Sequence, residues 1–446
     1  MKENNKIQLS DHFTYGKMMR FTLPPVVMMI FTSIYGVVDG FFVSNFVGKS
    51  AFTAVNFVMP VIMILGGLGF MFGTGGSALI AKTLGEGDSE RANGIFSMLI
   101  LFSALCGAAI AGIGLAVLRP VVALLGAEGE LLENSILYAR VVIIGIPALF
   151  LQYEFQSLLV TAEKPKLGLW VTVAAGVTNM ALDALFVAAF RWGIVGAAVA
   201  TVLSECIGGL LPVVYFFCKN TSRLRFTKPV FSGRDLLRIC TNGSSELMSN
   251  IAMSLVSMLY NTQLLRYAGE DGVAAYGVLM YVSMIFVAVF FGFSVGTAPV
   301  IGFHFGVQNH GELKSLLRKS LTVISVFSVC MFALALGLAK PLSLLFVGYD
   351  EILMEMTLHA FFIFSFSFFF SGFAIYGSSF FTALNDGITS AIISFLRTLV
   401  FQIAAVLIFP LIWKLDGIWI SIVAAEAMAV VVSAAFLVAK RKKYHY

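Results

Sequence analysis

The chain contains an internal duplication. When the sequence is compared with itself at an offset of 221 residues, the stretch 48–93 aligns with 269–314 without a gap, and about a quarter of the positions are identical. The identical pairs include Gly48 with Gly269, Met59 with Met280, Phe70 with Phe291, Gly75 with Gly296 and Gly85 with Gly306. The same offset carries Pro120 to Pro341 and Thr161 to Thr382. We infer two copies of one ancestral unit, an arrangement that is common in membrane transporters.

The composition indicates the solvent in which both copies fold. Apolar residues make up 59% of the chain and charged residues only 12%, against roughly a quarter charged in soluble domains. Apolar stretches of about 20 residues can cross a bilayer. Such stretches cover 20–41, 53–79, 93–117, 135–157, 167–190, 194–217, 240–265, 273–303, 316–338, 354–382, 388–411 and 416–439. We therefore predict an all-α membrane protein with twelve transmembrane helices in two pseudo-symmetric six-helix lobes around a central cleft.

The basic residues predict the orientation of these helices, because Lys and Arg are retained on the cytoplasmic side during insertion. If the spans alternate, the basic run 219–238 and the tail 440–443 lie on one side. We therefore predict a multi-pass protein of the cytoplasmic membrane with both termini in the cytoplasm. Its parts are an N-terminal lobe at 1–217, a basic linker at 218–238 and a C-terminal lobe at 239–446. Such a linker is typical of a loop near anionic lipid headgroups rather than of a nucleic-acid site.

The residues that most often carry enzyme chemistry are dispersed. The five cysteines and five histidines have neither zinc-like nor redox spacing. We therefore expect no enzyme, no cofactor and no metal other than a coupling ion. We also expect membrane lipids around a monomer.

Acidic residues inside the predicted spans need a reason, because a charged side chain at a helix centre costs about 2.5–3.5 kcal/mol on insertion scales. Three helices of the first copy each carry two polar residues four positions apart, which places them on one helix face. The pairs are Tyr35 with Asp39, Asn179 with Asp183, and Thr201 with Glu205. Their oxygens could bind a hard cation such as Na⁺, or the carboxyl groups could exchange a proton. The alternative is hydrogen bonding across packed helices.

The duplication favours a function for this set. The offset carries Asp39 to Tyr260 and Asp183 to Ala404, and only Gln402 lies near as a polar counterpart in the second copy. A feature that determines the fold should persist in both copies, whereas a coupling site can persist in one. By the same reasoning Glu205 and Glu426, which fall on one another at this offset, favour a structural pair.

These residues carry a resemblance to a prokaryotic member of the multidrug and toxic compound extrusion (MATE) family. The resemblance rests on the duplicated twelve-span layout, the segment from Ser33 to Asp39, the loops 85–88 and 306–309, and Asn179 with Asp183 followed by Thr201. In that family, acidic and polar residues at such positions bind the coupling Na⁺ or H⁺. The resemblance therefore implies that Asp39, Asn179, Asp183 and Thr201 form the cation-coupling site.

Further residues are candidates for coupling, substrate contact or helix bending. Some family members couple transport through carboxylates of the second lobe. Glu246 is the candidate for such a carboxylate in this chain. Tyr35 and Glu205 are further candidates for coupling or for substrate contact. Candidate substrate contacts in the cleft are Gln152, Tyr153, Gln156, Tyr276, Met280 and Tyr376. Pro24 and Pro25 remove backbone donors early in the first span and allow it to bend.

The resemblance implies a secondary active multidrug exporter that works by alternating access and exchanges Na⁺ or H⁺ for organic compounds. An acidic cleft with aromatic walls favours cationic, amphipathic drugs. One alternative is a transporter like the lipid-linked oligosaccharide flippases, which would need a basic cavity that only Arg140 and Arg397 could supply. Another is an exporter of one specialised metabolite.

Overall fold

The computed structural model describes residues 7–348 and 350–446. This part of the chain is almost entirely helical and contains no β-strand. The first half forms α1 (Tyr15–Phe42), α2 (Lys49–Gly85), α3 (Ser89–Leu124), α4 (Gly129–Thr161), α5 (Pro165–Asp183) and α6 (Gly193–Phe217). The second half forms α7 (Gly233–Gly306), α8 (His310–Val347), α9 (Glu351–Ser365), α10 (Phe368–Ala383), α11 (Gly387–Phe395) and α12 (Phe401–Tyr444). Short π-helical turns, η1 (Val43–Val47), η2 (Ala184–Ala189) and η3 (Leu396–Val400), follow α1, α5 and α11.

Two of these helices are too long to be single membrane spans. At about 1.5 Å per residue, the 74 residues of α7 would far exceed the thickness of a bilayer. Gly269 breaks α7 with φ 65° and ψ −152°, and Lys414 breaks α12 with φ 50° and ψ −126°. We call the parts of α7 before and after Gly269 α7a and α7b. Helices α9 and α10 form one span with a bend of 48°. So divided, the described helices form the twelve predicted spans, six in each half of the chain.

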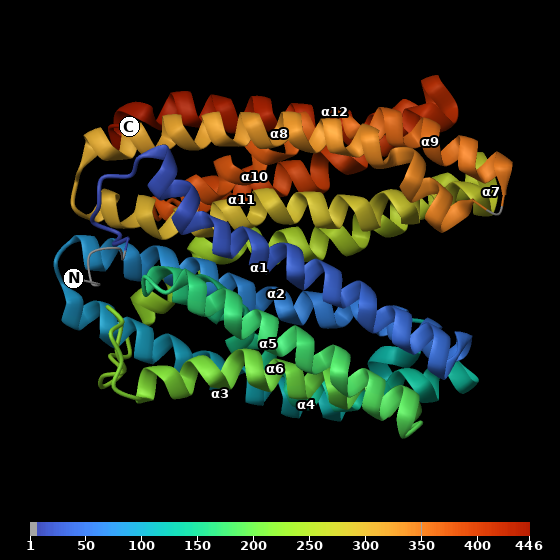
Figure 1. Cartoon of the computed structure of the whole chain (residues 1–446), viewed down its shortest axis with the longest axis horizontal. Helices are drawn as coiled ribbons and strands as arrows, with labels where there is room; N and C mark the ends of the chain where they lie inside the picture. Colours follow the sequence, from blue (N-terminus) through green and yellow to red (C-terminus); the bar gives the residue numbers. More distant parts are fainter. Residues whose placement is uncertain (1–6, 349) are drawn as a thin grey trace.

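The two halves form two lobes. Helices α1–α6 lie in one layer of Figure 1 and α7–α12 in the other. The start of α1, the C-terminus and the linker between α6 and α7 lie at the same end of the molecule, which we call the linker end (Figure 1). Helix α7 begins at Gly233, so residues 233–238 of the predicted linker are helical.

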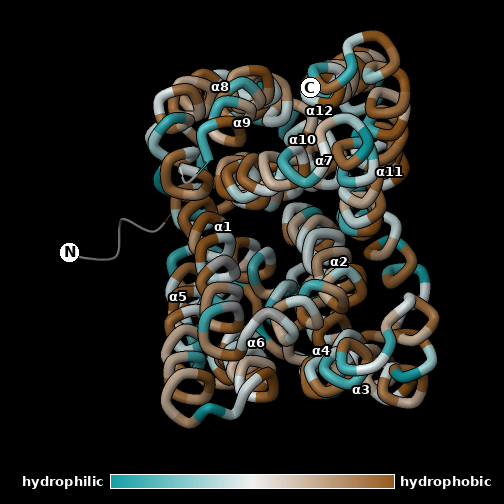
Figure 2. Tube along the Cα trace, turned by 90° about the vertical axis from the view of Figure 1, so that its right-hand side faces the viewer, coloured by the Kyte–Doolittle hydropathy of each residue, from teal (hydrophilic) through white to brown (hydrophobic). Residues whose placement is uncertain are grey.

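The outer surface of both lobes is apolar. Figure 2, which looks along the helices, shows hydrophobic residues around the outside of each lobe. Large exposed apolar side chains of the described chain include Trp170, Met258 and Leu411. In water such a surface would be unfavourable, whereas lipid tails cover it without cost, which agrees with a membrane protein.

Glycines bring the lobes together at the linker end. A Cβ at Gly75 would overlap the Ile239 carbonyl of α7a, and one at Gly85 would overlap the Phe303 carbonyl of α7b. Gly243 and Gly306 contact the backbone of α2 in the same way. Helix α2 therefore packs, backbone against backbone, on both arms of α7.

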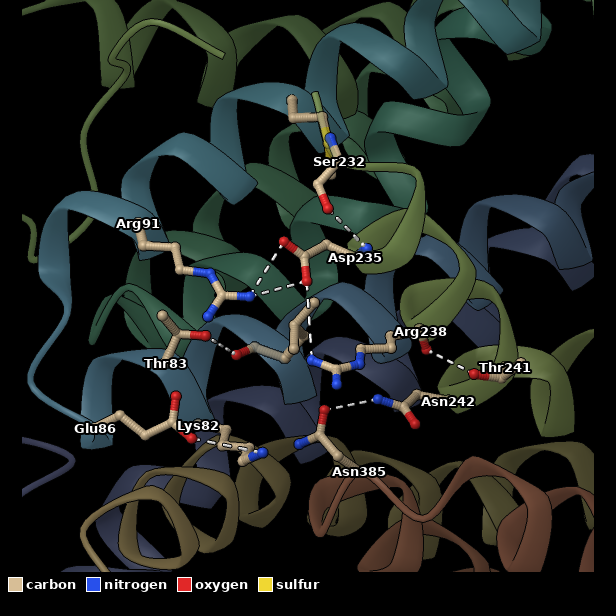
Figure 3. Close-up of polar contacts among 12 residues, drawn as sticks. Lys82, Thr83, Glu86, Arg91, Ser232, Asp235, Arg238, Thr241, Asn242 and Asn385 are labelled. Carbon is tan, nitrogen blue, oxygen red and sulfur yellow. Dashed lines mark hydrogen bonds and ion pairs between the residues drawn. The ribbon is translucent and has the colours of Figure 1, made fainter. Parts of the chain in front are cut away.

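Polar contacts also hold the two lobes together at this end. Arg91 of α3 donates to the buried Asp235 of α7a at 3.0 Å, and Asn242 donates to the Asn385 side chain at 2.7 Å (Figure 3). Asn385 in turn donates to the carbonyl of Ala78 in the other lobe. The linker end is thus closed in this conformation.

The segment before α1 spans the same end. Leu9 and Phe13 are fully buried. The Leu9 amide donates to Glu163, between α4 and α5, at 2.9 Å. The Phe13 amide donates to Glu312 of α8 at 2.9 Å. One short stretch of chain therefore ties the loops of both lobes together.

Candidate functional site

Three helices of the N-terminal lobe bring together the residues that the sequence singled out. Asp39 comes from α1, Asn179 and Asp183 from α5, and Thr201 from α6. The Asp39 carboxyl lies near Asp183 and Asn179 and interacts electrostatically with the Asp183 carboxyl. Tyr138 of α4 reaches Thr201 and interacts electrostatically with both carboxyl groups. We call Asp39, Asn179, Asp183 and Thr201 the N-lobe acidic site.

Irregular helix geometry surrounds this site. Asp183 is the last residue of α5, directly before the π-helical turn η2, and η1 begins four residues after Asp39. The two turns lie against each other. A π-helical turn loosens the regular hydrogen-bond ladder and often occurs at functional sites. Here it lets the last turns of α1 and α5 depart from straight helices beside the carboxyl groups.

The oxygen atoms of the site are buried without partners. Asp183 is 0% exposed, and neither of its carboxyl oxygens has a hydrogen-bond partner among the described residues. The same holds for Oδ1 of Asp39 and Oδ1 of Asn179. Burying such groups unpaired is costly, and more so when they are ionised. Two facing carboxyl groups can be stabilised by a shared proton or by a cation between them.

The donor set fits a monovalent cation better than a transition metal. No group of three His, Cys, Asp or Glu side chains in the described chain is close enough to hold a metal ion. Two carboxyl groups, an amide oxygen and a hydroxyl are hard oxygen ligands. Na⁺ or a proton is therefore the ligand that these residues suit.

The C-terminal lobe has a different arrangement at the position of Asp39. There Tyr260 donates to Gln402 at 2.7 Å and shares a hydrogen bond of 2.9 Å with Ser421. The Tyr260 ring also stacks on Tyr276. These groups are neutral, and Gln402 and Ser421 both hydrogen-bond to Tyr260, so no charge at that place calls for an ion.

The other acidic candidates lie in different surroundings. Glu246 lines a small cavity of about 20 Å³ between the lobes, together with hydroxyl-bearing side chains such as Ser77, Ser294 and Thr382. Glu426 forms an ion pair with Arg397 at 2.9 Å. Glu205 is 6% exposed and its Oε2 has no partner. Sequence symmetry grouped Glu205 with Glu426, but only Glu426 has a basic partner.

The predicted cleft residues do not share one surface. Tyr153 stacks on Phe70 at 4.1 Å, and Phe70 contacts Phe291 of the other lobe, so Tyr153 belongs to an aromatic row that crosses between the lobes. Tyr276 and Tyr376 are 6% and 1% exposed.

The remaining predicted cleft residues are also mostly enclosed. Tyr376 packs on Phe293 and Phe380 inside the C-terminal lobe. Gln152 and Gln156 are buried in α4, and Met280 is partly buried. Of the six predicted contacts, Tyr153 is thus the one that contributes to an aromatic row across the lobes.

The predicted bend in α1 lies at a contact between the lobes. Pro24 and Pro25 are inside α1, and a Cβ at Gly292 of α7b would overlap the backbone at Val26 and Pro25. Tyr35 lies farther along α1 and reaches Gln152 of α4. A change of bend at the prolines would therefore move Asp39 relative to α5 and α6.

Two buried groups near these helices were not predicted as site residues. Tyr138 bridges Thr201 and the carboxyl pair, and Glu154, 0% exposed, accepts a hydrogen bond from Ser103 at 2.9 Å. A tyrosine in an apolar span carries no special sequence signal. Glu154 was visible as a carboxylate within a span, but it has no polar residue four positions away that would mark a shared face.

Comparisons with known proteins agree with this architecture. The MatE family model matches residues 24–185 and, a second time, 247–408. The multidrug export protein MepA of Staphylococcus saprophyticus is 25% identical over 336 residues, covering 74% of this chain and 73% of that protein. MepA of Staphylococcus aureus strain MRSA252 is 26% identical over 338 residues, covering 75% and 74%.

A solved structure shows the same fold. It is the outward-facing conformation of a multidrug resistance MATE family transporter of the MOP superfamily, with a TM-score of 0.93 and 24% identity. The alignment covers 100% of this chain and 99% of that one. The two matches of the family model, one in each lobe, also support the duplication seen in the sequence. The chain belongs to the MatE family and is a multidrug and toxic compound extrusion (MATE) transporter.

Proposed function

We propose that this transporter is a secondary active multidrug exporter that exchanges Na⁺ or H⁺ for organic compounds, with a preference for cationic, amphipathic ones. The observation that carries the proposal is the N-lobe acidic site, with its facing carboxyl groups and unpartnered buried oxygens. A site that needs a positive charge for stability is suited to bind and release a coupling cation. The multidrug export proteins among the relatives support drugs as the substrate class.

The closed linker end supports a mechanism of alternating access. The glycine contacts and the Arg91–Asp235 pair hold α2 and α3 against α7 at that end. Export requires a second conformation in which these contacts separate. Cation binding beside Asp39 would change the packing or bend of α1, which also contacts α7b, and would thereby shift the balance between the two conformations.

The proposed orientation places the linker end in the cytoplasm. The linker, the C-terminal tail and the start of α1 lie there (Figure 1), and the basic residues of the linker and tail favour the cytoplasmic side of a plasma membrane. The conformation described here would then be closed to the cytoplasm, as expected for the outward-facing half of the cycle. In that state the N-lobe acidic site would receive cations from outside.

The driving force is sufficient for drug accumulation. One monovalent cation moving through about 100 mV supplies about 2.3 kcal/mol, and a tenfold concentration gradient adds about 1.4 kcal/mol. Together these support accumulation of roughly a few hundredfold for a neutral substrate. For a singly charged cationic drug a one-for-one exchange moves no net charge, so the tenfold concentration gradient alone supports about tenfold accumulation. The aromatic row of Tyr153, Phe70 and Phe291 offers faces on which a cationic ring can bind.

A lipid-linked oligosaccharide flippase fits less well. Recognition of a pyrophosphate needs free basic groups in the cleft. The Arg397 guanidinium is held by Glu426, and Arg140 is exposed on α4. An exporter of one specialised metabolite remains the alternative that the transport assay separates from multidrug export.

The test is efflux of ethidium from proteoliposomes under an imposed Na⁺ gradient or an imposed H⁺ gradient. We expect one gradient to drive efflux in the wild type and the Asp183→Asn variant to lose it. An anionic dye serves as the substrate control. Equal export of both dyes would overturn the preference for cations, and efflux that needs no gradient would overturn the coupling.

A further inference from the structure

Glu205 is a third acidic side chain in the interior of the N-terminal lobe. It lies on α6 four residues after Thr201, which is about one helical turn, and it is 6% exposed. Its Oε2 has no hydrogen-bond partner in the described chain. The carboxyl interacts electrostatically with Asp39 and with Tyr35 of α1. It therefore interacts with the charge of the N-lobe acidic site without being one of its four residues.

Other oxygens face the same region from α1 and α4. A Cβ at Gly145 of α4 would stand 3.0 Å from Oε2 of Glu205, so the glycine is what leaves room for this carboxyl. Gln152 of α4 is 4% exposed, reaches the Tyr35 hydroxyl and keeps its own Oε1 unpartnered. Tyr35 thus lies near both Glu205 and Gln152, and the carboxyl and the amide each keep one buried oxygen without a partner in the described chain.

The buried glutamate of the other lobe shows what is missing here. Glu426, also 6% exposed, is neutralised by Arg397 of η3. Glu163 and Asn385 both have a left-handed backbone conformation and follow the ends of α4 and α10, so they occupy equivalent positions in the two lobes. With the offset between these two residues, Arg397 corresponds to Ala175. With the offset of 221 it corresponds to Gly176.

Neither counterpart of Arg397 can supply a positive charge to Glu205. Ala175 and Gly176 are both buried, and at Gly176 even a Cβ would meet the Phe31 ring at 2.5 Å. The N-terminal lobe therefore has no basic residue at either position that corresponds to Arg397.

We propose that Glu205, together with Gln152 and Tyr35, forms a second binding site for a monovalent cation. None of these three residues is one of the four that make up the N-lobe acidic site. The close packing at Gly145 and at Gly208, where a Cβ would overlap Gln152, suits a proton or a bare Na⁺. An organic ammonium group would need more space.

This inference rests on the proposed cation-coupled export and sets its stoichiometry. If both sites load, more than one cation crosses per substrate. The limit of substrate accumulation then rises with a higher power of the cation gradient. With the membrane potential clamped at zero, each additional cation multiplies this limit by the gradient itself, which is about tenfold for a tenfold gradient.

The experiment measures the limiting accumulation of ethidium in proteoliposomes at a fixed Na⁺ gradient and, separately, at a fixed H⁺ gradient. We expect Glu205→Gln to lower the limit by about tenfold at a tenfold gradient, while export still depends on the gradient. The gradient under which the limit falls identifies the ion. Glu154→Gln is the matched control: it removes a buried glutamate of the same length whose hydrogen bond from Ser103 an amide oxygen can still accept, and it should leave the limit unchanged.

A second readout does not require transport. Binding of radioactive Na⁺ to the purified protein should fall by one ion per molecule in Glu205→Gln if the site takes Na⁺. If it takes a proton, infrared difference spectra across a pH step should lose one band of a protonated carboxyl. A wild-type accumulation limit together with unchanged Na⁺ binding and an unchanged infrared spectrum would overturn the second site.

Failure of the proposed function would look different. In that case no cation gradient would drive export by the wild type, and Asp183→Asn would behave like the wild type. The binding and infrared measurements on Glu205→Gln would still decide whether the second site exists.

Discussion

In the C-terminal lobe Tyr260 hydrogen-bonds both Gln402 and Ser421, whereas at the matching position of the N-terminal lobe Asp39 faces the carboxyl of Asp183. The first arrangement is neutral and complete. The second leaves several buried oxygens unpartnered. Since both lobes have the same six-span fold, the fold itself does not require carboxyl groups at this place. Their presence in one lobe only points to a task that the other lobe does not share.

The buried glutamates repeat this contrast. Glu426 has its positive partner within the protein, in Arg397, and Glu205 has none. Glu426 is thus neutralised within the C-terminal lobe, whereas we propose that a bound cation neutralises Glu205 in the N-terminal lobe. We expect this difference to separate the effects of mutation into losses of stability in the C-terminal lobe and losses of coupling in the N-terminal lobe.

The largest expected effect is on stability in the C-terminal lobe. Arg397→Met leaves the Glu426 carboxylate buried and unpaired, and breaking such a pair costs about 3–5 kcal/mol. Thermal unfolding in detergent should show a large drop in midpoint. The double variant Arg397→Met with Glu426→Leu should recover most of it, because an apolar pair avoids the unpaired charge. A single variant as stable as the wild type would contradict the structural role of this pair.

The next effect is on coupling in the N-terminal lobe. Asp183→Asn removes a carboxyl that the cation needs, and we expect gradient-driven export to fall by about 100-fold, within the range of coupling energies between sites. Size-exclusion profiles should match those of the wild type, because no internal partner is lost. Asp416→Asn, an exposed residue paired with His359, is the control and should keep full export. Loss of folded protein in Asp183→Asn would indicate a packing role instead.

A smaller effect tests the neutral network. Tyr260→Phe removes the hydroxyl that joins Gln402 and Ser421, and a lost hydrogen bond of this kind costs about 1 kcal/mol. Chemical unfolding should report this decrease, and the dependence of export on the cation gradient should not change. A shift in that dependence would mean that the C-terminal lobe takes part in coupling after all.

The smallest effect concerns a carboxyl at the linker end. Burial alone would raise the pKa of Asp386, but hydrogen bonds from Lys440 and Thr389 outweigh it and hold the pKa below its ordinary value. A lowered folded-state pKa contributes stability above the unfolded pKa of about 4, and this contribution disappears as the pH falls through the folded value. Asp386→Asn should therefore cost about 0.5 kcal/mol at neutral pH.

The measurement for Asp386 is thermal unfolding of wild type and variant along a pH series. Their midpoints should differ near pH 7 and converge in acid. Midpoints that diverge as the pH falls would show that the carboxyl is not stabilised by its partners in the folded state.

The lobes and spans could be predicted because the length of each apolar stretch can be read directly from the sequence. The twelve spans are confirmed, but most helices extend several residues beyond the apolar stretches. Polar caps explain this: Asp88 and Asn309 accept hydrogen bonds from backbone amides and begin α3 and α8 before the apolar residues start. Polar first turns do not appear in an apolar count.

The site could be predicted in part. Spacing of four residues placed Asn179 with Asp183 on one face, and the duplication distinguished them from structural residues. The pairing of Arg397 with Glu426 was not predicted, because nothing in the sequence shows which helices are neighbours. The burial of Tyr276 and Tyr376 inside the C-terminal lobe could not be predicted for the same reason. The coupling role of the site stays a prediction.

The glycine contacts at the linker end have a consequence for how the transporter tolerates change. At Gly75, Gly85, Gly243 and Gly306 the two lobes touch through main-chain atoms alone. A single added methyl group at any of them would wedge the lobes apart in this conformation and leave the conformation with separated lobes unhindered. Replacement of one hydrogen atom by a methyl group would thus shift the equilibrium between the two conformations without any contact to the drug.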